Sequence, residues 1–251
     1  IGYALKWVYP TASNPITIFL NPGTYNNSNE DFPLNVTSNL TIMGSGISET
    51  IIDAGGDSQV FIINNSDNVT ISDMTISGGS GYLGGGILIE ESDVLLNNLL
   101  ITDNGAEYLG CGIFMGNSSS VVRNVTISDN NFGTGAFFSW GSTPILEDVI
   151  ISNHDVCGCG MIIVGVHPPS GPPILTNVTI QNNYFDKGGG MSIFDSDPIL
   201  NYVSILDNTA NEHGGGIFIE QSPIVTMNNV TIAGNSAPEG GGGGIFVQTS
   251  F

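Results

Sequence analysis

Residues 198–220 read Pro-Ile-Leu-Asn-Tyr-Val-Ser-Ile-Leu-Asp-Asn-Thr-Ala-Asn-Glu-His-Gly-Gly-Gly-Ile-Phe-Ile-Glu, and the same order of residue types returns along most of the chain. Each copy has an apolar run that closes on Ile, then a polar turn, then a glycine-rich segment followed by another apolar run. Repetition with a period between about 20 and 50 residues is typical of solenoids and related repeat architectures. The closing isoleucines are Ile76, Ile101, Ile127, Ile151, Ile180, Ile205 and Ile232.

The glycine-rich segments form a second series, out of phase with the first. Glycine suits a bend that needs positive φ or a close approach between neighbouring coils. The polar turn between the two series usually ends in Asn, whose side-chain amide can bond the same position one coil away and so form a ladder. The turns are Asp103-Asn104, Asp129-Asn130, Asn153-His154, Asn182-Asn183, Asp207-Asn208 and Gly234-Asn235, and the glycine segments begin at Gly84, Gly110, Gly133, Gly158, Gly188, Gly214 and Gly242.

Within each apolar run the hydrophobic residues alternate with polar ones, which is the period of a strand. One repeat is too short to bury its own apolar face, whereas copies stacked at ~4.8 Å would share one continuous core. The pattern therefore predicts an all-β parallel β-helix of about nine coils of ~25 residues, forming a single domain over 1–251. We expect N-terminal coils and a partial cap in 1–60 and regular repeats in 61–251. The side chains predicted to be buried are Val125, Ile127, Val178, Ile180, Val203, Ile205, Val230 and Ile232.

Two families resemble this pattern. The Asn-Asn turn followed by Gly-Gly-Gly-Ile is similar to the repeats of the polymorphic outer-membrane proteins. More broadly, the opening segment Ile16-Thr-Ile-Phe-Leu-Asn-Pro-Gly-Thr-Tyr25 and the later Ile51-Ile-Asp-Ala-Gly55 resemble the first coils of the pectate-lyase-like superfamily. The resemblance implies a right-handed β-helix. It says little about function, because such coils serve lyases, hydrolases, adhesins and structural proteins alike.

The chain has 23 acidic and three basic residues, for a net charge of −20. This balance argues against nucleic acid and against anionic membranes, both of which need clustered Lys and Arg. It is compatible with divalent cations. No apolar run approaches the ~20 residues of a membrane span. Because residue 1 is Ile and no signal peptide is present, we expect the chain to be a segment of a longer protein.

The basic residues are the first candidates for catalysis, since a lyase of this fold would need one of them beside carboxylates. The resemblance implies Ca²⁺-holding carboxylates with an Arg or Lys for a lyase, but Arg123 and Lys187 are more than two coils apart. The motifs of polygalacturonases and pectin methylesterases are absent. We therefore expect no enzymatic activity and no catalytic residues. His154 takes a ladder position and has no partner that suggests catalysis.

Three acids allow a metal site. Asp195, Asp197 and Glu220 are expected near one another on adjacent coils, where like charges repel and Ca²⁺ could bridge them. A solvated edge without metal is the simpler interpretation. Among the aromatic residues, Trp140 and the Phe137-Phe138 pair suggest an exposed patch for sugar, although at least one of these Phe residues should face the core.

The cysteines are expected to be small buried thiols. Cys111 and Cys159 should lie two coils apart, roughly 9.6 Å, which exceeds the about 4.4–6.8 Å between the Cα atoms of a disulfide. Cys157 is only two residues from Cys159, which is also poor geometry for a bridge.

Nine Asn-x-Ser/Thr sequons suggest N-glycosylation, although a repeated turn and strand would also produce Asn-Val-Thr. Glycosylation would require a secreted chain, so we expect an extracellular or cell-surface location. The candidates are Asn26, Asn35, Asn39, Asn64, Asn68, Asn117, Asn124, Asn177 and Asn229.

The sequence thus favours a non-enzymatic extracellular β-helix with a structural or adhesive role, such as a filament or cell-surface subunit. The alternative is a polysaccharide-active lyase or hydrolase, or a carbohydrate-binding module. We expect contact with carbohydrate and end-to-end self-association, because an open terminal coil presents unpaired strand backbones.

Overall fold

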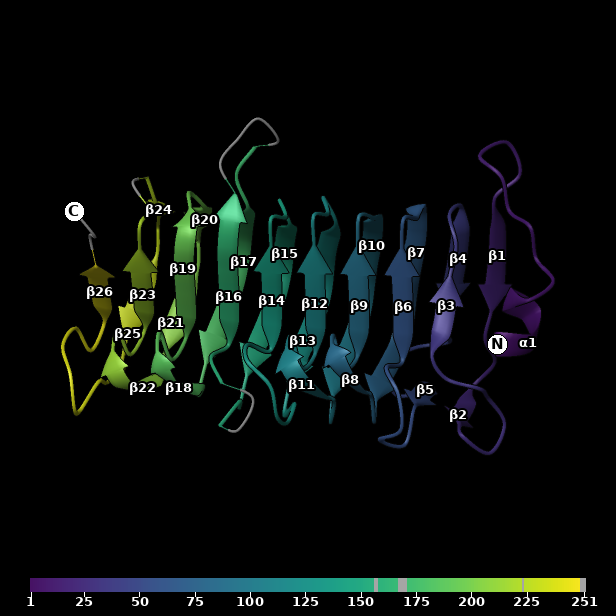
Figure 1. Ribbon diagram of the computed structural model, residues 1–251, viewed down its shortest axis with the longest axis horizontal. Coiled ribbons are helices and arrows are strands. Elements are labelled where there is room, and N and C mark those ends of the chain that lie inside the picture. Colours follow the sequence, from purple (N-terminus) through teal and green to yellow (C-terminus); the bar gives the residue numbers. More distant parts are fainter. Residues whose placement is uncertain (156–157, 167–170, 223, 249–251) are drawn as a thin grey trace.

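The computed structural model describes residues 1–155, 158–166, 171–222 and 224–248 of the chain. The coils follow one another along a single axis, with the N-terminus at one end and the C-terminus at the other (Figure 1). The paired strands described here are parallel, and they form a solenoid of about nine turns with about 26 residues per turn. The all-β class and the stacked repeat predicted from the sequence are confirmed.

The largest sheet, called the long sheet here, runs the whole length of the solenoid. Its strands hold the Val-x-Ile runs that defined the repeat. They are β1 (Ile16–Phe19), β2 (Gly23–Asn26), β4 (Leu40–Met43), β5 (Thr50–Asp53), β7 (Asp67–Ser77), β10 (Asp93–Thr102), β13 (Val121–Ser128), β15 (Ile145–Ser152), β17 (Ile174–Gln181), β20 (Ile199–Asn201), β21 (Ser204–Leu206), β24 (Thr226–Asn228) and β25 (Thr231–Ala233).

A second sheet faces the long sheet across the core. Its strands follow the glycine segments and are β3 (Leu34–Val36), β6 (Phe61–Asn64), β9 (Ile87–Glu90), β12 (Ile113–Gly116), β14 (Phe137–Trp140), β16 (Met161–Val166), β19 (Met191–Ser196), β23 (Ile217–Glu220) and β26 (Ile245–Gln248). Two short pairs complete the coils. They are β8 (Ser80–Leu83) with β11 (Gly105–Leu109), and β18 (Tyr184–Lys187) with β22 (Thr209–His213).

The register of the long sheet stacks like on like. Ile127 pairs with Ile151 and Ile151 with Ile180, so the closing isoleucines form one column inside the solenoid. Ile180 and Val178 are fully buried. Burying such side chains is the main favourable term in folding, and here one continuous core joins residues from β1 to β23.

Each long-sheet strand from β7 to β17 bends in its middle. The residue at the bend has positive φ, for example 52° at Asn124 and 55° at Asn177. Asn and Asp tolerate this conformation better than other non-glycine residues. We call this exposed column the outer column. It contains Asp73, Asn98, Asn124, Asp148, Asn177, Tyr202 and Asn229.

The predicted asparagine ladder is confirmed and lies inside the next bend. In most rungs an Asn Oδ1 atom accepts hydrogen bonds from the backbone and the side chain of the ladder residue one coil earlier. For example, Asn130 Oδ1 accepts from Asn104 N and Asn104 Nδ2, both at 3.0 Å. The Nδ2 of Asn104 also donates to the carbonyl of Ile76 at 3.0 Å. We call this column the inner ladder. It contains Asn104, Asn130, His154, Asn183, Asn208 and Asn235.

A serine ladder, which the sequence analysis missed, holds the bend that follows the second sheet. The backbone N–H of Ser92 donates to Ser118 Oγ at 3.1 Å, and that of Ser118 donates to Ser142 Oγ at 3.0 Å. The signal in the sequence was the serine that recurs at this bend, as in Glu91-Ser92 and Asn117-Ser118, where it follows a residue with positive φ.

The glycine segments behave as predicted. Gly110 has φ of 69°, and a Cβ at Gly85 would lie 2.0 Å from the carbonyl oxygen of Gly105 in the next coil. The first position therefore needs positive φ and the second needs close approach between coils.

A smaller apolar cluster lies outside the main core, between the second sheet and the short strands. Phe138 is buried in it and stacks on Phe114, with ring centroids 5.8 Å apart. Phe137 is buried in the main core. Phe137 thus faces the core, as expected for at least one of the pair, whereas the predicted exposure of the other is wrong, because the outer face of the second sheet is itself covered. Trp140 alone of the three is exposed, at 53%.

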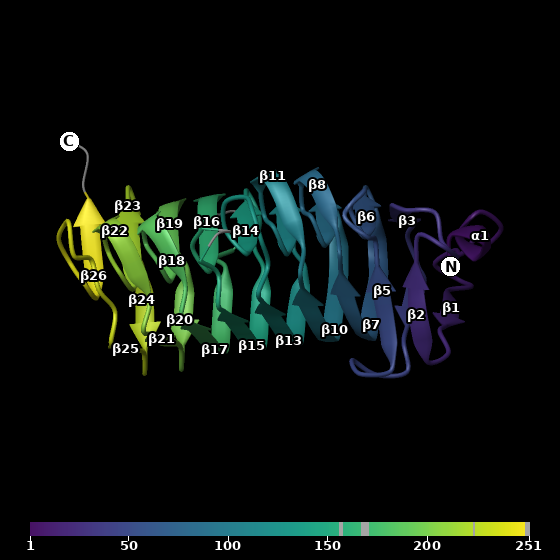
Figure 2. The same ribbon diagram turned by 90° about the horizontal axis from the view of Figure 1, so that it is seen from below.

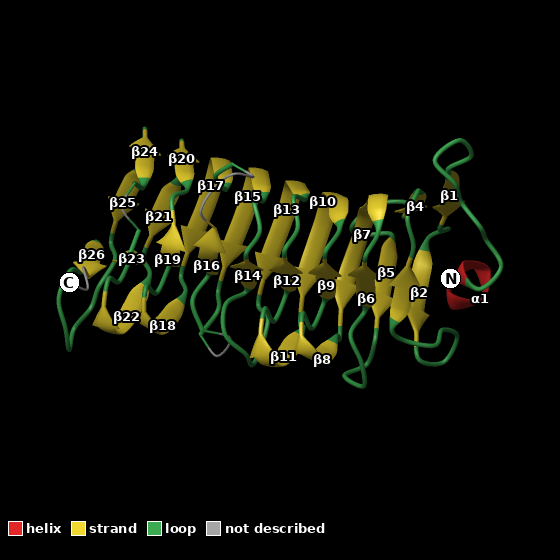
Figure 3. Ribbon diagram, turned by 45° about the horizontal axis from the view of Figure 1, so that its top comes forward, coloured by secondary structure: helices red, strands yellow, loops and turns green. Residues whose placement is uncertain are grey.

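The ends differ from the middle. At the N-terminus, α1 (Gly2–Leu5) lies beside the first coils (Figure 3), and Ile1 and Leu5 pack against the core. At the other end, Val230 and Ile232 are only half-buried, so their predicted full burial is wrong. The reason is geometric, since β24 and β25 form the edge of the long sheet within the described residues. No helix in the described ranges is long and apolar enough to cross a membrane.

Candidate functional site

Exposed aromatic side chains follow the short strands along one side of the solenoid. Tyr82 lies on β8, Tyr108 on β11, Phe132 on the next coil and Tyr184 on β18, with exposed fractions of 61, 54, 70 and 40%. Figure 2 shows β8 and β11 side by side, with β18 nearer the C-terminal end. We call these four residues the aromatic strip. Its ends are four coils apart, about 19 Å at a spacing of ~4.8 Å per coil.

The two tyrosines at the N-terminal end of the strip form a stacked pair. Their ring centroids are 5.6 Å apart and their planes differ by 20°. In both strands the residue after Tyr is Leu, and Leu109 is buried in the small outer cluster with Leu83 packed against it. Strand alternation thus anchors the leucines and presents the tyrosines to solvent. The recurring Tyr-Leu-Gly at 82–84 and 108–110 was the sequence signal for this pair, and the sequence analysis missed it.

Phe132 has an unusual backbone. Its φ is 51°, and its carbonyl accepts a hydrogen bond from Ala106 N at 3.1 Å. A bulky residue at positive φ costs about 1 kcal/mol or more and is concentrated at functional positions. The Phe132 side chain is exposed, so its packing does not offset the cost of this backbone conformation.

A small hollow of about 140 Å³ lies at the C-terminal end of the strip, lined by Gly133, Asp155, Gly158, Tyr184, Phe185 and Asp186. A polar network fixes its rim. The Tyr184 hydroxyl donates to Asn211 Oδ1 at 2.5 Å, and Asn211 Nδ2 donates to Asp186 Oδ1 at 2.9 Å. The hollow thus places carboxylate oxygens and an oriented tyrosine beside one another.

The charge around the strip is negative. Glu107, Asp155 and Asp186 are exposed on or beside it. Each of the three basic side chains is in an ion pair elsewhere or at the edge of the strip. The pairs are Lys6 with Asp31 at 3.7 Å, Arg123 with Glu147 at 2.6 Å, and Lys187 with Glu212 at 3.6 Å.

Among the residues that the structure describes, two titratable side chains have clearly shifted pKa values, and both are buried. Burial lowers the pKa of His154 to about 4, while the hydrogen bond to Asn183 and the charges of Asp129 and Asp155 oppose that shift. Burial raises the pKa of the Cys159 thiol. Neither group is open to a substrate, so neither shift indicates catalysis.

The prediction of buried thiols is confirmed for one cysteine and wrong for another. Cys159 is a free, buried thiol, as predicted. The prediction is wrong for Cys111, which is disulfide-bonded. The predicted distances excluded only the two disulfides that would involve Cys159. Cys157 lies outside the described residues.

The three acids of the predicted calcium site lie on two adjacent coils. Glu220 at the end of β23 is in register with Phe194, one position before Asp195. Asp197 Oδ1 accepts the backbone N–H of Ile224 at 2.9 Å. In the described part of the chain, no three His, Cys, Asp or Glu side chains form a group that could hold a metal ion. The calcium site stays a prediction.

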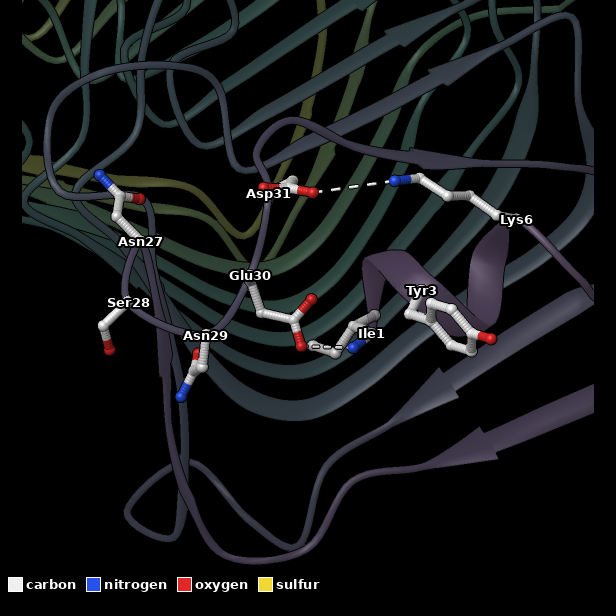
Figure 4. A pocket seen from close by; sticks show the side chains of 8 residues that line it. All are labelled: Ile1, Tyr3, Lys6, Asn27, Ser28, Asn29, Glu30 and Asp31. Atoms are coloured by element: carbon white, nitrogen blue, oxygen red, sulfur yellow. Dashed lines mark hydrogen bonds and ion pairs between the residues drawn. The ribbon is translucent and has the colours of Figure 1, made fainter.

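A charged hollow of about 310 Å³ is at the N-terminal end and is lined by Ile1, Tyr3, Lys6, Asn27, Ser28, Asn29, Glu30 and Asp31. Figure 4 shows its charged groups directed at one another, with Glu30 towards the ammonium of Ile1 and Lys6 towards Asp31. Glu30 also accepts the backbone N–H of Gly2 at 2.7 Å. These charges compensate one another, so the hollow is a weaker candidate than the strip.

The nine sequon asparagines all reach solvent. Asn26 and Asn39 are half-buried, and the other seven are exposed. Asn124 and Asn177 belong to the outer column and also hydrogen-bond across coils, to Asn97 and Asp148 respectively. At these bends the side chains were expected to point outward or to form a ladder, and Asn124, Asn177 and Asn229 are exposed, with the first two also bonded across coils. Their glycosylation stays a prediction.

Comparison with known proteins supports the fold. The family model of the right-handed β-helix region matches residues 58–251. The chain is similar to the A-module of mannuronan C-5 epimerase AlgE4 from Azotobacter vinelandii, with a TM-score of 0.62 and 17% identity over 96% of this chain and 75% of that one. It is also similar to pectin methylesterase from carrot, with a TM-score of 0.55 and 14% identity over 100% of this chain and 84% of that one. At these identities the likeness shows the fold alone. No curated protein sequence matches the chain.

Proposed function

The chain belongs to the right-handed β-helix family, and from that premise we propose that it is a non-enzymatic, extracellular adhesive protein that holds carbohydrate along its aromatic strip. The observation that carries the proposal is the exposed, stacked pair of Tyr82 and Tyr108 on a rigid scaffold. Aromatic rings present large apolar faces at low entropic cost and carry a polar tip, which suits a ligand with apolar ring faces and hydroxyl edges.

The scaffold favours binding over catalysis. The strip follows short strands that are anchored by buried leucines and by ladder bonds between coils, so its aromatic residues keep a fixed spacing. Fixed spacing lowers the entropic cost of binding a long ligand. The two titratable groups with shifted pKa values, His154 and Cys159, are buried rather than open to the hollow, whereas an enzyme places such groups in its cleft.

An extracellular location is supported by the exposure of the sequon asparagines. Seven exposed acceptors on a surface of Asn, Ser and Thr suit a secreted chain. The low number of basic residues is consistent with a surface that does not bind nucleic acid.

The test compares wild-type protein with Tyr82→Ala/Tyr108→Ala by native electrophoresis in gels that contain a panel of soluble plant and microbial polysaccharides. We expect retardation of the wild type by at least one polysaccharide and loss of that retardation in the double variant. The matched control is Tyr202→Asn, which removes a tyrosine of similar exposure, 62%, from the outer column. Retardation by none of the panel, or equal loss in the control, would refute the proposal.

The same polysaccharides are incubated with the protein and assayed for new reducing ends, released methanol and unsaturated products. We expect none. Turnover that depends on Asp155 or Asp186 would instead place the chain among polysaccharide-active enzymes, the function of the two similar structures as their names state it.

A further inference from the structure

The charges around the aromatic strip restrict which polysaccharide can bind there. Resting on the proposed function, we infer that the ligand of the strip is a neutral polysaccharide and that the strip excludes polyuronates. The two structurally similar proteins are named for mannuronan and pectin, so this inference separates the chain from them.

The first argument is the state of the basic residues. A polyuronate carries one carboxylate on each sugar and needs cations to compensate that charge. Here Lys6, Arg123 and Lys187 all lie in ion pairs with carboxylates of the chain. Lys187 is the one closest to the strip, and its ammonium is also 5.4 Å from the centre of the Phe218 ring. Binding a uronate through Lys187 would break both contacts.

Carboxylates near the strip would repel the carboxylates of a polyuronate. Glu107 precedes Tyr108, and Asp155 and Asp186 line the hollow at the other end. With a net charge of −20, the whole chain adds an unfavourable potential for any polyanion. Like charges placed against one another cost affinity and serve to reject the wrong partner.

The third argument is hydrogen-bond chemistry. Ionised carboxylates only accept hydrogen bonds, so Asp155 and Asp186 can bind ligand groups that donate. Sugar hydroxyl groups donate, and bonds from them to a carboxylate are charge-assisted and strong. A uronate carboxylate cannot donate. The aromatic faces of Tyr82 and Tyr108 then supply the apolar contact that a neutral sugar ring needs.

Hydroxyethylcellulose, galactomannan and dextran serve as neutral probes, and polygalacturonate and alginate as acidic ones. Binding is measured by retardation in native gels, once with EDTA and once with Ca²⁺. We expect at least one neutral probe to retard the protein equally in both buffers, and neither acidic probe to do so in either. Tyr82→Ala/Tyr108→Ala should weaken binding roughly tenfold or more, and Tyr202→Asn should not.

A charge variant sharpens the test. Asp155→Asn/Asp186→Asn keeps the size of the side chains and removes two charges near the hollow. We expect it to weaken binding of the neutral probe, because an amide is a weaker acceptor than a carboxylate. Unchanged melting of the variant shows that the fold is intact.

The outcomes separate the two proposals. Tyrosine-dependent retardation by polygalacturonate or alginate, with EDTA or with Ca²⁺, would overturn the neutral-ligand inference and leave the adhesive function standing. Absence of tyrosine-dependent retardation by every probe would refute both.

Discussion

Asparagine occupies two positions in almost every coil, one in the inner ladder and one in the outer column. Asn183 of the inner ladder is 2% exposed, whereas Asn177 of the outer column, six residues earlier, is exposed. Asn177 lies within β17, beside Val178, and Asn183 follows the end of that strand. The same residue type is therefore used in two environments, one inside a core strand and one at the bend after it.

The two positions use different parts of the residue. Asn183 satisfies buried polar groups with its side chain, because its Oδ1 lies 2.8 Å from His154 Nδ1 and its Nδ2 donates to Asn208 Oδ1 at 2.9 Å. Asn177 contributes mainly its backbone, with φ of 55° at the bend, and its side chain donates to Asp148 at the exposed surface. This difference explains the substitutions within each column. The inner ladder accepts His154, which can also donate and accept, and the outer column accepts Tyr202, whose side chain reaches solvent.

The strongest test disrupts β17, which contains Asn177 of the outer column and is followed by Asn183 of the inner ladder. Ile180→Asp places a charge among fully buried side chains, and such a charge costs more than the stability of an ordinary domain can offset. We expect no cooperative thermal transition by circular dichroism. Thr179→Asp, on the opposite face of the same strand, should fold. Unchanged melting of Ile180→Asp would refute the assigned register.

The next test compares the columns directly. Asn183→Leu leaves the backbone N–H and the ring N–H of His154 without their partner, and it removes one of the two donors to Asn208 Oδ1. Buried unpaired groups cost about 1–3 kcal/mol each, so the free energy of unfolding should fall by roughly 3–5 kcal/mol. Asn177→Gly keeps the positive φ and should change it by less than about 1 kcal/mol. Urea unfolding measures both. Equal losses would show that the two columns do not differ in role.

A third test uses pH to perturb one rung of the inner ladder. The pKa of His154 is lowered from 6.5 to about 4 in the fold, so between these values the unfolded chain binds a proton that the folded chain does not. The stability of the fold should therefore fall as pH decreases from about 6.5 to about 4, by about 3 kcal/mol in total. His154→Asn restores the ladder amide and should lose this component. Identical pH profiles for the two proteins would contradict the assignment.

The smallest expected effect on stability comes from glycans on the outer column. In material secreted from a eukaryotic host, Asn124, Asn177 and Asn229 should carry N-glycans, because these side chains reach solvent at bends. Intact mass before and after enzymatic deglycosylation reports occupancy. Asn124→Gln/Asn177→Gln/Asn229→Gln should reduce the mass shift with little change in melting. Equal mass shifts for this variant and the wild type would exclude these sites.

Much of the fold could be predicted from the sequence, because the spacing of a repeat determines which residues are paired between neighbouring coils. The closing isoleucines, the glycine segments and the Asn turns each recur once per coil, and stacking identical coils is the arrangement that buries their apolar faces together. The predicted burial of Ile127, Val178 and Ile205 and the inner ladder with His154 were recovered in this way.

The candidate site was decided by the tertiary structure. Tyr82 and Tyr108 are 26 residues apart, and only the coil register stacks their rings. Phe138 is buried because the short strands cover the outer face of the second sheet. No local sequence pattern predicts that this face is covered. A repeat determines which residues share a column, because that is a matter of spacing along the chain. Which columns face solvent depends on what packs against them from outside the coil, and that is known only once the coils are assembled.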